Sequence, residues 1–140
     1  MERIKYDMSL MKTMSLFETL THTPLKDSII DKNNLLLFVV DEADMSRAIG
    51  KEGSNVRKME GLLNRKIKIL GYTPDLVQFT RNVLYPLRVK DISEQDGIIT
   101  INGDDPRTKG LLIGKNSQNL KNNLSIIQRY FDNVKEIKVI

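Results

Sequence analysis

The second half of the chain repeats the first half. The segment RAIGKEGSNVRKMEGLLNR (residues 47–65) aligns with LLIGKNSQNLKNNLSIIQR (residues 111–129) at an offset of 64 residues, and Ile-Gly-Lys recurs intact in both copies. Asn55 falls on Asn119, and three apolar positions stay apolar in register, with Val56, Leu62 and Leu63 on Leu120, Ile126 and Ile127. In a chain of 140 residues, such a repeat predicts two copies of one small unit, each of about 65 residues.

Hydrophobic periodicity predicts the same order of elements in both copies. Apolar residues spaced three and four apart indicate helices, whereas short apolar or alternating runs between polar residues indicate strands. KIKIL (66–70) alternates in this way and predicts a strand with its lysines exposed. In the first copy the order is helix 9–21, strands 26–32 and 34–41, short helix 43–49, a longer helix after the glycine loop, and strand 66–70. The second copy follows with helix 75–85, strands 87–93 and 97–104, short helix 106–113, a longer helix, and strand 135–140.

This order predicts an α+β fold of two α-β-β-α-α-β domains, each with a three-stranded sheet covered by helices. GYTP (71–74) is the natural boundary, because Pro74 favours the start of a new helix. We therefore expect a first domain over residues 1–73, which includes the N-terminal helix, and a second over residues 74–140.

The stretch AIGKEGSNVRK (48–58) places Gly-Lys-Glu-Gly between two predicted helices. The first N–H groups of a helix lack intrahelical partners and carry the positive end of the helix dipole, so this loop is a candidate anion site. Glycine permits unusual φ angles and a close approach of a sugar-phosphate chain. Ser54 and Ser117 stand where N-caps of the longer helices are expected.

Basic residues gather around both loops. The formal net charge of the chain is +4, and no acidic residue occurs from Pro106 to Phe131. This placement favours a polyanionic partner more than the total charge does. The candidate phosphate contacts near the first loop are Arg47, Lys51, Arg57 and Lys58, and those near the second are Arg107, Lys109, Lys115 and Lys121.

Several function classes fit the sequence poorly. The chain has no cysteine and one histidine, His22, so we expect no metal site and no cofactor. GLLIGKNS (110–117) lacks the spacing of a P-loop, and no constellation suits acid–base or nucleophilic chemistry, so we expect no enzyme. No apolar run is long enough to cross a membrane. We therefore expect the protein in the cytoplasm, and we also expect a monomer.

The element order with IGKEG between helices resembles the type II KH domain, and the tandem arrangement is similar to the archaeal NusA-type transcription termination and antitermination factors. The resemblance implies an RNA-binding protein of transcription regulation, which contacts single-stranded nascent RNA. It also implies RNA polymerase as a second partner. The RNA-contacting loops that it implies are Gly50, Lys51, Glu52 and Gly53, and then Gly114, Lys115, Asn116 and Ser117.

Two alternatives remain open at the level of sequence. One is a KH protein of translation or ribosome assembly, and the other is a module whose main partner is a protein. Within the resemblance, Ser117 replaces the second glycine of the loop and is expected to hold the backbone slightly farther from a phosphate.

Overall fold

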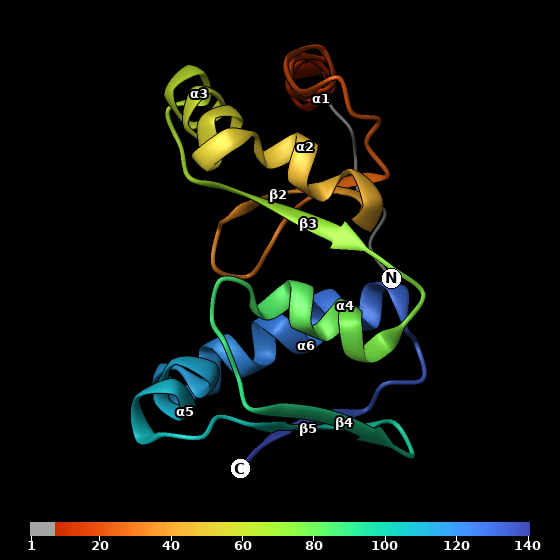
Figure 1. Ribbon diagram of the computed structural model, residues 1–140, viewed down its shortest axis with the longest axis vertical. Coiled ribbons are helices and arrows are strands. Elements are labelled where there is room, and N and C mark those ends of the chain that lie inside the picture. Colours follow the sequence, from red (N-terminus) through yellow and green to blue (C-terminus); the bar gives the residue numbers. More distant parts are fainter. Residues whose placement is uncertain (1–7) are drawn as a thin grey trace. The chain divides into compact units, whose positions relative to one another are not determined.

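The computed structural model describes residues 8–140 and divides the chain between Tyr72 and Thr73 into two units (Figure 1). Both units contain a three-stranded sheet with helices on it, in the order α-β-β-α-α-β. The predicted α+β class and the element order of the two KH-like repeats are therefore confirmed.

The first unit begins with helix α1 and pairs β1 antiparallel with β2, which in turn pairs parallel with β3. The sheet order is β1-β2-β3. Short 3-10 turns precede and follow helix α2, and the second of them is the glycine loop. The elements are α1 (Met8–Thr21), β1 (Asp27–Ile30), β2 (Leu36–Asp41), η1 (Glu42–Asp44), α2 (Met45–Ile49), η2 (Lys51–Gly53), α3 (Ser54–Leu63) and β3 (Ile67–Tyr72).

The second unit repeats this topology, with sheet order β4-β5-β6 and the same antiparallel and parallel pairings. Helix α4 starts after Asp75, whose carboxylate accepts hydrogen bonds from the N–H groups of Val77 and Gln78. The elements are α4 (Leu76–Leu84), β4 (Asp91–Gln95), β5 (Ile98–Asn102), α5 (Pro106–Ile113), η3 (Lys115–Ser117), α6 (Gln118–Tyr130) and β6 (Glu136–Val139).

The core of the first unit forms where α1 meets the sheet. Phe17 of α1 stacks on Phe38 of β2 with ring centroids 4.4 Å apart, and both side chains are fully buried. Alternate residues on a strand share one face, so the neighbours of Phe38 on this face are Leu36 and Val40. Ala48 of α2 and Met59 of α3 belong to the same cluster, and this packing fixes the two helices that flank the glycine loop.

The core of the second unit centres on Phe79 of α4, whose ring lies 5.5 Å from that of Tyr130 and 5.3 Å from that of Phe131. On α6 the helical spacing of Leu120, Leu124, Ile127 and Phe131 predicts one buried apolar stripe, and this prediction is only partly correct. Ile126 and Ile127 are buried, whereas Leu120 and Leu124 are half-buried. The face of α6 that packs inward therefore includes Ile126, which lies outside the predicted stripe.

The alternation expected for KIKIL is correct for Lys66 and wrong for Lys68. The Lys66 side chain is 86% exposed, but Lys68 lies beside buried Leu37 in the parallel pairing and is half-buried itself. Burial lowers the pKa of Lys68 from 10.5 to about 8, although the Asp31 carboxylate acts in the opposite direction. The strand therefore carries a lysine whose charge opposes folding.

We expect the free energy of unfolding to rise with pH between about 8 and 10.5, because in this window the unfolded chain keeps a proton on Lys68 that the folded chain has released. At pH 7 the charged side chain costs on the order of 1–3 kcal/mol. Urea unfolding across this pH range checks the prediction. Lys68→Met should flatten the rise and stabilise the protein at pH 7, whereas Lys66→Met should do neither. Equal pH profiles for the two variants would contradict the assignment.

No helix within residues 8–140 is both long enough and apolar enough to span a membrane.

Candidate nucleic-acid interface

The two glycine loops follow the same backbone path. Gly50 has φ 80° and ψ 167°, and Gly114 has φ 73° and ψ 172°. The third loop residues, Glu52 and Asn116, are left-handed at φ 53° and 55°, although neither is a glycine. Such values are uncommon for residues with a Cβ, so their recurrence indicates that the loop conformation is imposed by its surroundings.

Each loop is a single 3-10 turn closed by its own hydrogen bonds. In the first unit the N–H of Gly53 donates to the carbonyl of Gly50 over 3.1 Å, and the N–H of Ser54 donates to the carbonyl of Lys51. The second unit repeats both bonds. The expectation of a row of unpaired N–H groups is therefore wrong for two of them, because the turn uses them itself.

The N-cap prediction is wrong for Ser54 and correct in position for Ser117. Gly53 occupies the N-cap position of α3, and Ser54 is already helical. Ser117 does occupy the N-cap position of α6, but its side chain makes no capping hydrogen bond. In both loops the residue before the helix is left-handed, with φ 74° at Gly53 and 61° at Ser117. This conformation differs from the extended one in which a serine usually caps.

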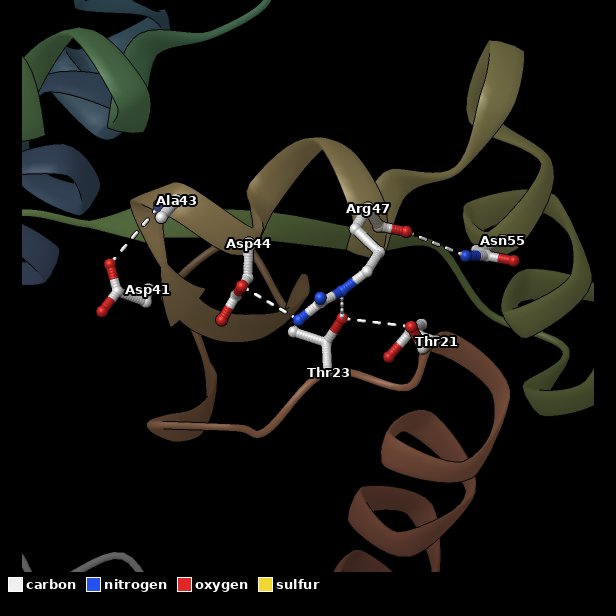
Figure 2. Close-up of polar contacts among 7 residues, drawn as sticks. All are labelled: Thr21, Thr23, Asp41, Ala43, Asp44, Arg47 and Asn55. Atoms are coloured by element: carbon white, nitrogen blue, oxygen red, sulfur yellow. Dashed lines mark hydrogen bonds and ion pairs between the residues drawn. The ribbon is translucent and has the colours of Figure 1, made fainter.

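An asparagine bridges each loop from the following helix. The side-chain amide of Asn55 donates to the carbonyl of Arg47 over 3.2 Å (Figure 2), and that of Asn119 donates to the carbonyl of Leu111 over 2.8 Å. These bonds tie the last turn of the short helix to the first turn of the long one. The sequence pattern predicted no role for this pair, although the repetition of asparagine at matching positions was the available signal.

The same asparagines explain the first glycine of each loop. A Cβ on Gly50 would lie 2.7 Å from Oγ of Ser54 and 3.0 Å from the backbone nitrogen of Asn55. A Cβ on Gly114 would lie 2.7 Å from the side chain of Asn119 and 2.9 Å from its backbone nitrogen. Gly50 and Gly114 are therefore required both by their φ angles and by the close approach of the helix.

Basic side chains around the first loop already have partners within the unit. Arg47 turns its guanidinium away from Asn55, toward Asp44 at 2.9 Å and the Thr23 hydroxyl at 3.3 Å (Figure 2). Arg57 donates through Nη1 to the Glu52 carbonyl. Lys51 at the loop and Lys58 on α3 are exposed. The structure thus places the four predicted cations near the loop, but it uses two of them for internal contacts.

The second loop has a different setting. Lys115 and Lys121 are exposed, as is Arg107, while Lys109 is half-buried. The nearby acid, Asp105, caps α5 by accepting from the Thr108 N–H over 2.7 Å, and this hydrogen bonding lowers the pKa of its carboxyl. Leu111 stands at the position aligned with Arg47 and is 50% exposed, so the contacts of Arg47 have no counterpart here.

A family model for the KH domain matches residues 13–102, more than half of the chain. The probable transcription termination protein NusA of Methanococcus vannielii is 32% identical over 141 residues, which cover 99% of this chain and 80% of the relative. The chain belongs to the KH domain family, in its archaeal NusA type. The loops described above are therefore the glycine loops of a NusA-type KH protein.

Other members support the same assignment. A probable transcription termination protein NusA from Methanocaldococcus jannaschii is 29% identical and covers 91% of this chain and 70% of the relative. The probable transcription termination protein NusA of Thermoplasma acidophilum is 27% identical, and the match covers 99% of this chain and 97% of the relative. Among solved structures, the one titled "Crystal structure of APE1850" has a TM-score of 0.68, is 25% identical, and covers 93% of this chain and 96% of its own.

Proposed function

We propose that this protein is an RNA-binding transcription termination factor that holds nascent single-stranded RNA through both glycine loops. The observation that carries the proposal is the repetition, in a NusA-type KH chain, of one loop geometry with a lysine directly after the first glycine. KH domains clamp about four nucleotides of single strand with such a loop. The proposal needs no catalysis.

The proposed contacts are those that the sequence indicates, with roles refined by the geometry. Lys51 and Lys115 are exposed at the loops and would meet phosphate directly, with Lys58 and Lys121 one to two helical turns away. Gly50 and Gly114 would allow the close backbone approach. We propose that Arg47 and Arg57 mainly stabilise the conformation of the first loop, because their guanidinium groups contact Asp44 and the Glu52 carbonyl within the protein.

A fluorescence anisotropy titration tests RNA binding. A short labelled single strand and a duplex of equal length are titrated, at two salt concentrations, with the wild type and with a variant carrying Lys51→Asp, Glu52→Asp, Lys115→Asp and Asn116→Asp. We expect the wild type to prefer the single strand and the variant to lose at least about tenfold in affinity. Each lost phosphate contact should reduce the salt slope by roughly 0.7 log units per log unit of salt.

A control variant carries Lys66→Asp and Lys138→Asp, which reverse the charge of two exposed lysines outside the loops. Circular dichroism establishes that each variant keeps its fold. Equal affinity of the loop variant and the control would overturn the assignment of the loops. Wild-type protein that binds neither RNA would overturn the function itself and leave a protein partner as the leading alternative.

A second experiment addresses transcription. Site-specific crosslinking of the protein to RNA emerging from a stalled elongation complex tests contact with nascent RNA, and run-off transcription then reports whether termination increases or decreases. Recovery with RNA polymerase from a cell extract would support the proposal. Recovery with ribosomal subunits alone would favour a role in translation or ribosome assembly.

A further inference from the structure

The two glycine loops share a backbone but lie in opposite charge environments. In the aligned windows 41–60 and 105–124, the first holds four basic and five acidic residues, for a net charge of −1, and the second holds four basic residues and one acidic residue, for a net charge of +3. Screening limits the reach of exposed charges to roughly 8 Å in physiological salt, so the residues near each loop decide the potential that a phosphate meets there.

Around the first loop, two of the four basic side chains are also engaged in internal contacts. The Arg47 guanidinium forms an ion pair with Asp44, and Arg57 donates to a loop carbonyl. Glu52 is exposed within the loop itself, directly after Lys51. A phosphate that approaches Lys51 would therefore meet a carboxylate one residue away.

Around the second loop, neutral residues replace several of these acids. Asn116 stands where the first loop has Glu52, and Asp105 is held at the N-terminus of α5 by its capping bond to Thr108. Within the described part of the chain, the ammonium groups of Lys109, Lys115 and Lys121 make no ion pair. Their charge remains available to a polyanion.

Ser117, which replaces the second glycine, leaves the backbone conformation of the more positively charged second loop unchanged relative to the first. Its φ and ψ of 61° and 23° are close to the 74° and 21° of Gly53, so the second loop follows the path of the first despite the Cβ. The backbone conformation of the second loop therefore matches that of the first, and the expected effect of the Ser117 side chain on the approach of a phosphate stays a prediction. Charge, and not backbone geometry, distinguishes the two loops.

We propose that the second loop, Gly114–Ser117, makes the principal RNA contact, and that the first loop, although it carries the full Gly-Lys-Glu-Gly motif, is the weaker site. This inference rests on the proposed function, because it divides the RNA affinity between the two proposed loops. The partner is the phosphate backbone of single-stranded RNA, and phosphate contacts dominate such affinity.

Two matched substitutions test the proposal. Lys51→Gln and Lys115→Gln each remove one charge from an exposed lysine at the first position of a 3-10 turn. In anisotropy titrations with a short single-stranded RNA, we expect Lys115→Gln to weaken binding roughly fivefold or more, with a salt slope lower by about 0.7. Lys51→Gln should change the affinity less than twofold.

A second test exchanges the third residue of each loop, Glu52 and Asn116, for the residue of the other loop. Asn116→Glu should weaken binding, and Glu52→Asn should strengthen it, because each substitution gives one loop the charge of the other while the left-handed backbone is retained. Circular dichroism and urea unfolding show that the four variants fold alike.

The outcomes separate this proposal from the proposed function. A loss for Lys51→Gln that equals or exceeds the loss for Lys115→Gln overturns the ranking of the loops and leaves RNA binding intact. Unchanged affinity in both variants, with the wild type still binding, means that RNA is held elsewhere and overturns both assignments. A wild type without RNA affinity overturns the proposed function directly.

Discussion

Gly50→Ala is expected to destabilise the first unit by about 2–4 kcal/mol and to weaken RNA binding. At φ 80° and ψ 167°, Gly50 occupies a region that is nearly confined to glycine. An added Cβ would also lie 3.0 Å from the backbone nitrogen of Asn55, which helix α3 cannot move without losing its contacts. Urea unfolding measures the first effect, and anisotropy with single-stranded RNA measures the second.

Gly61→Ala is the matched control on helix α3. Apart from its chain neighbours and the backbone of its own helix, nothing lies within 4 Å of the position that a Cβ would take on Gly61, and its φ is not positive. Alanine in a helix interior should therefore stabilise by about 0.5–1 kcal/mol. If Gly50→Ala proved as harmless as Gly61→Ala, the loop would not require glycine, and its conformation would need another explanation.

Phe17→Ala is expected to lower the free energy of unfolding by about 3–5 kcal/mol, because it removes a fully buried ring and leaves a cavity against Phe38. Phe17 lies on α1 and Phe38 on the central strand β2, so the substitution detaches the helix from the sheet. The same sheet supports α2 and α3 through Ala48 and Met59, and the loop between these helices should lose its fixed geometry.

Met11→Ala on the same helix is the control for Phe17→Ala. The Met11 side chain is 56% exposed, so its truncation should change the free energy of unfolding by no more than about 0.5 kcal/mol. Denaturant unfolding of both variants supplies the comparison. Losses of similar size would show that α1 is not anchored to the sheet through Phe17.

Much of the fold could be predicted from the sequence because the signals are local. Pro106 falls at the first helical position of α5, where its fixed φ and missing N–H are tolerated. The apolar run of β2 became the central strand of its sheet. Where the signal was ambiguous the prediction was less accurate, as on α6, where buried Ile126 lies outside the predicted apolar stripe.

The candidate site was less predictable, because its contacts join residues from different elements. The pattern located both loops and the basic residues around them. It gave no sign that Arg47 would turn to Asp44 and Thr23, or that Arg57 would reach the Glu52 carbonyl. Rotamers of long side chains depend on neighbours brought together by folding, and a sequence pattern does not record those neighbours.

By itself, the sequence determined the repeat, the order of elements in each unit, and the position of each glycine loop, because periodicity and the requirements of glycine and proline act over a few residues. Only the tertiary structure decided that Asn55 and Asn119 bridge the loops, that Ser117 takes the backbone conformation of Gly53, and that Lys68 is half-buried in its sheet. Each of these results depends on packing between elements, and that packing sets which polar groups find partners and which charges lose water.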